Sequence, residues 1–189
     1  MPNIYILAGP NGSGKSTAAR ALVPQFLNCA EFVNADDIAR GLSACHPEGV
    51  AFQAGRTMLA RLDELAGQGV DFAFETTLSS RTFAPWLRRR QAEGYTFRLH
   101  YFCLQNAEMA IDRVAARVRA GGHHVPSDDI RRRFERSRSN FLELYMPLAN
   151  VWEFYDTTAT KPKLVAFGGR DFPTTVVIES VWDKLIQRV

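Results

Sequence analysis

The hydrophobic positions of the chain fall into short continuous apolar runs that alternate with longer amphipathic stretches. The first run, residues 3–8, contains β-branched and aromatic residues, which is typical of a buried strand. Similar runs predict strands at residues 30–33, 70–74, 95–104 and 163–167, with a shorter one at 176–177. The chain is therefore expected to contain a sheet of several short strands.

Between these runs, apolar residues recur at the three- and four-residue spacing of helices. This spacing predicts helices at residues 17–23, 38–42, 49–67, 80–94, 107–120, 127–148 and 180–189. The predicted apolar positions of the stretch 49–67 are Phe52, Met58, Leu59, Leu62, Leu65 and Ala66. Those of the longest stretch are Ile130, Phe134, Ser137, Phe141, Tyr145 and Leu148. Pro147 is expected to kink or interrupt that helix, because proline cannot continue the backbone hydrogen bonds.

Strands that alternate with helices are typical of a parallel sheet between two layers of helices. The predicted fold class is therefore a three-layer α/β domain with a parallel sheet. Its 189 residues suit one domain, and no repeat, low-complexity tract or linker suggests a boundary. Ligands of such sheets bind at the carboxyl ends of the strands, so the residues that follow each strand are the candidates for chemistry.

Composition narrows the class of protein without naming a function. The hydrophobic fraction of 46% and charged fraction of 23% are ordinary for a soluble globular protein. A net charge of +3 is too small to imply nucleic-acid binding by itself. The three scattered cysteines predict reduced thiols in a cytoplasmic protein, with no disulfide or zinc framework. No signal peptide or membrane-spanning segment is predicted.

The strongest motif is G-x-x-x-x-G-K-S at residues 9–16, a phosphate-binding loop between the first predicted strand and helix. In this context successive backbone N–H groups and a helix N-terminus surround an anion. We expect Lys15 to reach the β- and γ-phosphates of a nucleoside triphosphate and the Ser16 hydroxyl to bind Mg²⁺. The predicted nucleotide-binding residues are Gly9, Asn11, Gly12, Ser13, Gly14, Lys15, Ser16 and Thr17. The motif places the fold among P-loop NTPases.

Acidic residues follow two other predicted strands. Asp36 is the candidate general base, because an unpaired carboxylate there could accept the proton of an acceptor hydroxyl. The alternative for Asp36 or Asp37 is an N-cap of the next helix, and we expect one of the pair to cap. Glu75 is a candidate to bind substrate hydroxyls or to hold Mg²⁺ through water, with a loop-stabilising carboxylate as the alternative.

Arginines on the predicted helices 107–120 and 127–148 are candidates for binding phosphate. Helical spacing places Arg113, Arg117 and Arg133 beside the buried faces, where they could reach a cleft. The alternative is a solvated helix face. The segment around 119–128 is a candidate lid, because it contains glycines and its residues show no apolar periodicity. No metal site is predicted at His123 and His124, because no carboxylate or cysteine lies at ligand spacing.

Taken as an ordered set, these motifs resemble the zeta-toxin family of P-loop kinases. The residues that carry the resemblance are 8–17, 34–37, 75–79, 121–126 and 131–134. The resemblance implies a fold like that of nucleotide kinases, ATP and Mg²⁺ as cofactors, and phosphorylation of the 3′-hydroxyl of UDP-N-acetylglucosamine or a related UDP-amino sugar. It also implies a small antitoxin protein as a partner.

The resemblance assigns roles by position. Lys15 matches the lysine of the phosphate-binding loop, and Asp36 matches the catalytic aspartate. Glu75 and Thr77 match substrate-binding positions. Asn34, Asp36 and Arg113 are further candidates for binding the substrate. The phosphate-binding arginines correspond to Arg117 and Arg133, with Arg113 as the alternative to Arg117.

The sequence thus predicts an ATP-dependent kinase acting on a hydroxyl, with a UDP-amino sugar as the expected acceptor. ATP is favoured over GTP because the chain has no N-K-x-D guanine motif. One alternative is a kinase of another small acceptor, such as an antibiotic, a nucleotide or a metabolite. From a different class, the chain could be a nucleotide-hydrolysing switch or a P-loop ATPase acting on nucleic acid. Only the arginine-rich region 113–138 supports nucleic acid. No membrane association is predicted.

Overall fold

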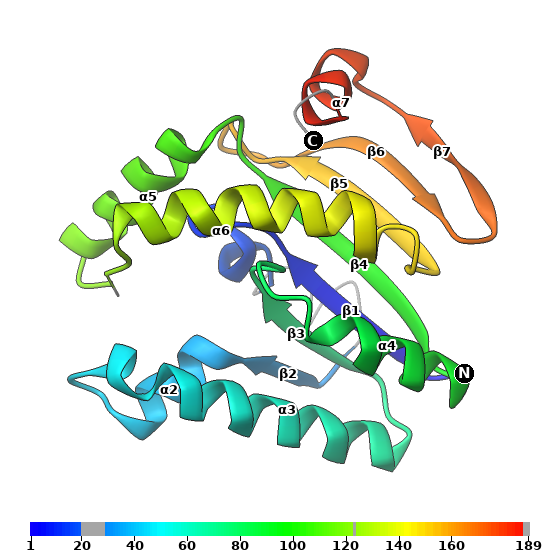
Figure 1. Ribbon diagram of the computed structural model, residues 1–189, viewed down its shortest axis with the longest axis horizontal. Helices are drawn as coiled ribbons and strands as arrows, with labels where there is room; N and C mark the ends of the chain where they lie inside the picture. Colours follow the sequence, from blue (N-terminus) through cyan, green and yellow to red (C-terminus); the bar gives the residue numbers. More distant parts are fainter. Residues whose placement is uncertain (20–28, 123, 187–189) are drawn as a thin grey trace.

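The computed structural model describes residues 1–19, 29–122 and 124–186, which form a seven-stranded sheet flanked by helices (Figure 1). The strand order is β2-β3-β1-β4-β5-β6-β7. The strands are β1 Asn3–Ala8, β2 Glu31–Asn34, β3 Phe72–Thr76, β4 Thr96–Cys103, β5 Val151–Asp156, β6 Lys163–Gly169 and β7 Phe172–Val176. The first five in this order are parallel, whereas β6 and β7 are antiparallel to their neighbours.

The helices occur where the apolar spacing predicts them. They are α2 Ala35–Leu42, α3 Ala51–Gln68, α4 Phe83–Ala92, α5 Ala107–Arg119, α6 Ser127–Asn140 and α7 Glu179–Ile186. A short 3-10 helix, Pro47–Val50, precedes α3, and a π-helical turn, Phe141–Tyr145, follows α6. Residues 15–19 begin the helix predicted after the phosphate-binding loop, and the remainder of that prediction lies outside the described residues.

Two features of the sheet differ from the sequence prediction. Strand β5 was not predicted, although Trp152 and Phe154 alternate with Glu153 and Tyr155 as in a strand with two different faces. This stretch directly follows the region of Pro147, where the only predicted element was the end of the long helix. The sheet is also not wholly parallel, because a hairpin of β6 and β7 extends its edge beyond β5. Mostly parallel strands with flanking helices otherwise confirm the predicted fold class.

The core has two parts that hold the strand ends in place. In the centre, β1 has five consecutive buried residues, as expected for a strand covered on both faces. Towards the β5 side, the π-helical turn and α7 pack on the sheet through aromatic rings. The Tyr101 and Phe141 rings stack with centroids 4.3 Å apart, and those of Trp152 and Trp182 with centroids 5.7 Å apart. These contacts hold the π-helical turn that follows α6, and also α7, against β4 and β5.

The carboxyl ends of β1, β2 and β3 meet at one edge of the sheet, where Ala8 pairs with Thr76 and Asn34 pairs with Glu75. In Figure 1 this edge lies between the α2–α3 pair and the α5–α6 pair. Over the described parts of the chain, we find no helix with the length and apolar character needed to cross a bilayer.

Candidate active site

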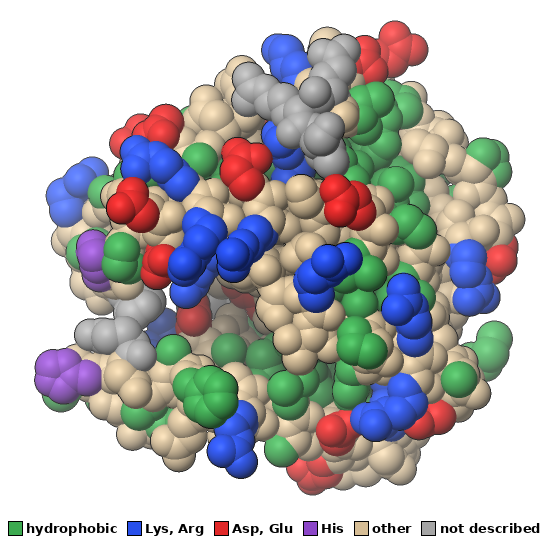
Figure 2. Space-filling model, viewed as in Figure 1, with side chains coloured by type: hydrophobic (Ala, Val, Ile, Leu, Met, Phe, Trp, Pro, Cys, Tyr) green, Lys and Arg blue, Asp and Glu red, His purple; other side chains and the backbone are tan. Residues whose placement is uncertain are grey.

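A cavity of about 880 Å³ opens at this edge of the sheet. Figure 2 shows a hollow in the left half of the surface, with a group of Lys and Arg side chains along its upper rim. Thirteen of the predicted site residues line the cavity: Asn11, Gly12, Gly14, Lys15, Ser16, Thr17, Asn34, Asp36, Glu75, Thr77, Arg113, Arg117 and Arg133. The other two, Gly9 and Ser13, belong to the phosphate-binding loop but do not line the cavity. The structure therefore brings together residues from five separate segments.

The phosphate-binding loop depends on glycine at its two closest approaches to the rest of the chain. Gly9 has a φ of +141°, and a Cβ there would lie 2.0 Å from the Phe102 carbonyl oxygen. Gly12 has a φ of +76°, and a Cβ there would lie 2.8 Å from the Ala110 carbonyl oxygen. Both positions exclude a side chain through conformation and through space. The loop is thus pressed against β4 and α5, and its backbone faces the cavity.

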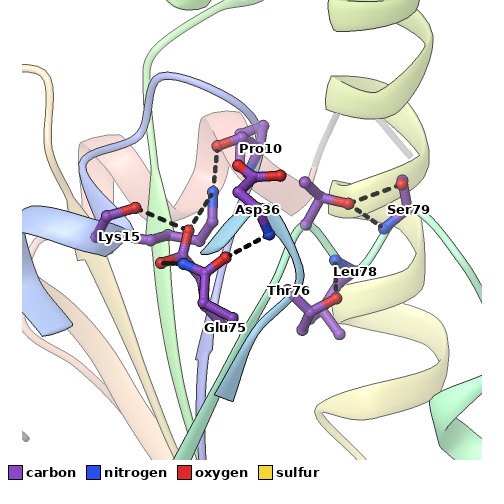
Figure 3. Close-up of polar contacts among 10 residues, drawn as sticks. Pro10, Lys15, Asp36, Glu75, Thr76, Leu78 and Ser79 are labelled. Carbon is purple, nitrogen blue, oxygen red and sulfur yellow. Dashed lines mark hydrogen bonds and ion pairs between the residues drawn. The ribbon is translucent and has the colours of Figure 1, made fainter. Parts of the chain in front are cut away.

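Lys15 lies under the loop with only 6% of its surface exposed. Its Nζ donates to the Pro10 carbonyl oxygen at 2.9 Å and lies 3.9 Å from Glu75 Oε1 (Figure 3). Burial lowers the pKa of Lys15, whereas the negative charges of Glu75 and Asp36 act in the opposite direction. The ammonium group is therefore held beside a carboxylate, at the place where the motif predicts phosphate.

Glu75 connects the phosphate-binding loop to the end of β2. Its Oε1 accepts a hydrogen bond from Ser16 Oγ at 3.1 Å, and its Oε2 accepts one from Asn34 Nδ2 at 3.0 Å. Burial raises the pKa of Glu75, while Lys15 and Ser16 act to lower it. Glu75 thus bonds to the groups expected to bind phosphate and Mg²⁺, so both of its predicted roles stay open and both stay predictions.

The prediction that Asp36 or Asp37 caps the following helix is wrong. Asn34 is the N-cap of α2, and its Oδ1 accepts a hydrogen bond from the Asp36 backbone N–H at 2.8 Å. Asp37 instead forms an ion pair with Arg40 on the surface of α2. Because Asn34 caps the helix, the Asp36 carboxylate is left at the cavity wall, on the side facing Lys15 (Figure 3).

The three predicted arginines reach the cavity from two helices. Arg113, on α5, donates from Nη2 to the carbonyl oxygens of Thr157 and Thr158, at 2.8 and 2.9 Å. Arg117 lies one turn further along α5 and packs against Gly122, where a Cβ would lie 2.6 Å from Arg117 Cγ. Arg133 comes from α6. Arg113 is therefore bonded to the loop after β5, and the choice of Arg117 or Arg113 as the partner of Arg133 for binding phosphate stays a prediction.

Sequence reasoning missed one wall of the cavity. Phe52, Gly55, Arg56 and Leu59 line it from one side of α3. Phe52 was predicted to be part of the buried face, but it is 82% exposed, whereas Met58 is buried as predicted. The spacing of apolar residues cannot separate a core face from a cavity face, because both repeat at the period of the helix.

The candidate lid is the segment around 119–128, which connects α5 to α6. Gly121 has a φ of +86°, as a chain reversal after α5 requires, and His123 lies outside the described residues. Closure of this segment stays a prediction. Within the part of the chain that the structure describes, no group of three or more His, Cys, Asp or Glu side chains could hold a metal ion.

Known structures share this fold over nearly the whole chain. The complex of AvrRxo1-ORF1 with AvrRxo1-ORF2, crystallised with sulphate ions, matches with a TM-score of 0.78 and 16% identity, over 98% of this chain and 63% of that one. This chain thus spans less than two thirds of that protein. A structure of the PezAT chromosomal toxin–antitoxin system of Streptococcus pneumoniae matches with a TM-score of 0.71 and 16% identity, over 98% of this chain and 78% of that one.

Sequence comparison identifies a relative and a family. An uncharacterized protein of Haemophilus influenzae is 28% identical over 126 residues, which are 67% of this chain and 88% of that protein. The model of a family described as "AAA domain" matches residues 4–144, from β1 to the π-helical turn, and so covers the phosphate-binding loop and every cavity residue named above. The chain therefore belongs to this AAA domain family, and it has the mostly parallel, kinase-like form of the P-loop fold.

Proposed function

We propose that this protein is an ATP-dependent kinase that phosphorylates a hydroxyl group of a UDP-amino sugar such as UDP-N-acetylglucosamine. The observation that carries the proposal is the arrangement of charges around one cavity. Lys15 lies on one wall, Asp36 faces it from the next, and Arg117 and Arg133 reach the same space from two helices. Phosphoryl transfer needs this set: cations for the phosphate charge and a carboxylate for the acceptor hydroxyl.

The donor groups fit a nucleoside triphosphate with Mg²⁺. The backbone of residues 12–16 and the helix N-terminus offer N–H groups to phosphate, and Lys15 adds a positive charge. Ser16 and Glu75 supply oxygen atoms, which are the ligands that Mg²⁺ prefers. A magnesium ion held there would supply positive charge that offsets the negative charge developing on the phosphate oxygens. Ser16 would hold it directly and Glu75 through water.

The chain's own groups divide the transfer into two tasks. Asp36 accepts the proton of the acceptor hydroxyl as its oxygen attacks the γ-phosphorus, and the bond to the β-phosphate oxygen breaks. Arg117 and Arg133 bind the oxygens of the transferred phosphoryl group on the sides that the phosphate-binding loop does not reach. Asn34, Glu75 and Thr77 line the same cavity, and we assign them to binding the acceptor. ADP and the phosphorylated sugar nucleotide are the products.

The UDP-amino sugar rests on the resemblance to zeta toxins and on the likeness to a toxin–antitoxin structure. The cavity volume of about 880 Å³ lies in the range of pockets for small organic ligands. The same likeness supports a small antitoxin protein as a partner. Because ATP and UDP-sugars are cytoplasmic metabolites, the proposed reaction belongs to the cytoplasm.

A nucleic-acid substrate has less support from the structure. Several arginines of the region that suggested it are paired within the chain: Arg131 with Glu108 and Asp128, Arg132 with Asp129, and Arg138 with Glu135. Paired charges weaken the field that attracts a phosphate backbone. A kinase of another small acceptor is the alternative that the cavity favours, because its apolar α3 wall does not specify a UDP-sugar by itself.

The test is to incubate the protein with Mg²⁺-ATP and a panel of acceptors and to detect products by mass spectrometry. The panel contains UDP-N-acetylglucosamine, UDP-glucose, a nucleoside monophosphate, an aminoglycoside and a sugar acid. We expect UDP-N-acetylglucosamine to gain one phosphate, with the Lys15→Ala variant as the control in which transfer is strongly reduced. Phosphorylation of a different member of the panel would show that the proposed acceptor is wrong. ATP hydrolysis that is stimulated by nucleic acid and gives no phosphorylated product would exclude a kinase.

A further inference from the structure

The loop between β3 and α4, residues 77–82, forms one wall of the cavity through Thr77, Ser80 and Thr82. Its backbone takes an unusual conformation at Leu78, which has a φ of +54° although it is not glycine. The Leu78 side chain is fully buried in the core. A bulky residue in the left-handed region is strained, so the rest of the structure must hold it there.

Part of the restraint comes from within the loop. The Leu78 backbone N–H donates to Thr76 Oγ1 at 3.1 Å, and the hydroxyls of Thr77 and Ser79 are hydrogen-bonded at 2.8 Å (Figure 3). Short polar side chains of this kind commonly stabilise turns. They direct the Thr77 hydroxyl along the loop, but they do not fix the loop relative to the helices across the cavity.

The other restraint comes from far along the chain. Asn140, at the end of α6, donates from Nδ2 to the Leu78 carbonyl oxygen at 2.8 Å. The Tyr145 hydroxyl donates to the Ser80 carbonyl oxygen, also at 2.8 Å. Asn140 is 9% exposed and Tyr145 is fully buried. The bond of Asn140 is buried and that of Tyr145 is partly buried, so both donor groups are largely shielded from water. Two side chains more than sixty positions away thus bind two carbonyl groups of the strained loop.

The π-helical turn allows both side chains to reach the same loop. In a continuous α-helix, residues five positions apart point about 140° away from each other, since each residue turns about 100°. In the π-helical turn the Met146 N–H bonds to the Phe141 carbonyl oxygen at 2.8 Å, which closes a ring five residues apart. Tyr145 is thereby rotated back towards the side occupied by Asn140. Single π-turns of this kind are frequent at functional sites.

The same side of α6 carries an arginine of the candidate active site. Arg133 precedes Asn140 by seven residues, which is close to two full turns of an α-helix, so both lie on nearly the same side. Arg133 lines the cavity where the phosphoryl group is expected, and Asn140 holds the loop on the acceptor side. One rigid helix therefore sets the distance between the two.

We propose that Asn140 and Tyr145 are positioning residues for the acceptor: they hold the loop 77–82 so that Thr77 and Ser80 present their polar groups to the acceptor at a fixed distance from Arg133. This inference rests on the proposed kinase function and adds residues that do not touch the substrate. It predicts that the loss of either hydrogen bond weakens acceptor binding and turnover but leaves ATP binding unchanged.

The variant that tests this is Tyr145→Phe, which removes one oxygen atom and keeps the ring packed. The matched control is Tyr95→Phe, because the Tyr95 hydroxyl also donates to backbone carbonyls, those of Ala66 and Val70, but lies away from the cavity. With UDP-N-acetylglucosamine as the probe, we expect the acceptor KM of Tyr145→Phe to rise about fivefold to tenfold, the range that one lost hydrogen bond gives. The KM for ATP should stay within about twofold, and Tyr95→Phe should change neither.

Asn140→Ala provides the second variant, and the expected pattern is the same. Hydrogen–deuterium exchange gives a readout that needs no acceptor: the amides of residues 77–82 should exchange faster in both variants and at the wild-type rate in Tyr95→Phe. If the wild-type protein does not phosphorylate UDP-N-acetylglucosamine, the proposed acceptor is wrong, and the panel's true acceptor takes its place in the KM measurement. Unchanged acceptor KM and unchanged exchange would overturn the inference. So would KM values for ATP and acceptor that rise together, because that pattern indicates a general loss of structure.

Discussion

Two walls of the cavity, the phosphate-binding loop and the loop 77–82, contain backbone in the left-handed region, and they stabilise it in opposite ways. The phosphate-binding loop uses glycines at Gly9, Gly12 and Gly14, so the conformation carries no steric cost. The loop after β3 uses Leu78, whose side chain anchors it in the core and whose carbonyl is held by Asn140. The first wall is specified by neighbouring residues, and the second by contacts across the fold. This difference predicts which substitutions act locally and which act through distant elements.

The largest effect is expected at Asp36, which lies between the two walls. Asp36→Asn keeps the size of the side chain but removes the group that accepts the proton, so kcat should fall about 10²–10⁴-fold. The KM for ATP should hardly change. Asp37→Asn is the control, because Asp37 pairs with Arg40 on the surface of α2. Steady-state kinetics decide the point, and a larger loss in the Asp37 variant would move the base by one residue.

The next largest effect is expected in the phosphate-binding loop. Lys15→Ala removes the cation beside the predicted phosphates, and the rate of transfer should fall roughly 10²–10³-fold, as for other groups that stabilise transition-state charge. Circular dichroism should show an intact fold, because the ammonium group contacts the loop and Glu75 and does not pack in the core. Transfer at the wild-type rate would remove the phosphate-binding loop from the mechanism.

The strain in the loop 77–82 is tested by whether glycine or alanine at position 78 gives the more stable protein. Leu78→Ala and Leu78→Gly both lose the buried side chain, but only glycine relieves the positive φ. We expect Leu78→Gly to be more stable than Leu78→Ala by about 1 kcal/mol in urea unfolding. At an ordinary helical position the order is reversed, so Ala115→Gly in α5 should destabilise by about 1 kcal/mol. If Leu78→Gly were the less stable of the two, the left-handed conformation would not be a source of strain.

The smallest effect is the pH dependence of stability that Glu75 contributes. Burial raises the pKa of Glu75 in the folded protein, so the folded state retains that proton to a higher pH than the unfolded chain. The contribution is fully present below the pKa of the unfolded state and is lost as pH rises through the raised pKa. The free energy of unfolding of the wild type should therefore decline relative to Glu75→Gln across that interval. Parallel pH profiles of the urea midpoints would contradict this.

The sequence predicted the parts of the fold and site that local residues determine. The phosphate-binding loop was recognisable because its glycines and its lysine occur at fixed spacing between a strand and a helix. Asp36 was found because it directly follows a strand, although the cap beside it proved to be Asn34. These features need only a short stretch of chain, so a single sequence reveals them.

What the sequence did not reveal depends on pairs of distant residues. Nothing near Leu78 indicates a positive φ, since leucine normally avoids it, and nothing near Tyr145 indicates a partner at Ser80. Tyr145 lay on the predicted apolar stripe and was correctly expected to be buried, but its hydroxyl has a second task that periodicity cannot detect. The prediction that Phe52 is buried failed for the same reason, because the cavity is formed only when α3 meets the other elements.

The hydrogen bonds of Glu75 have a consequence for how the binding of one substrate affects the binding of the other. This one carboxylate is bonded to Ser16 on the nucleotide side and to Asn34 on the acceptor side. A ligand that draws it towards either side changes its bonds on the other, so the two substrates should not bind independently. Thermodynamic reciprocity then requires that ATP alters the affinity for the acceptor by the same factor by which the acceptor alters the affinity for ATP. The Glu75 carboxylate would thus couple the binding of ATP to the binding of the acceptor.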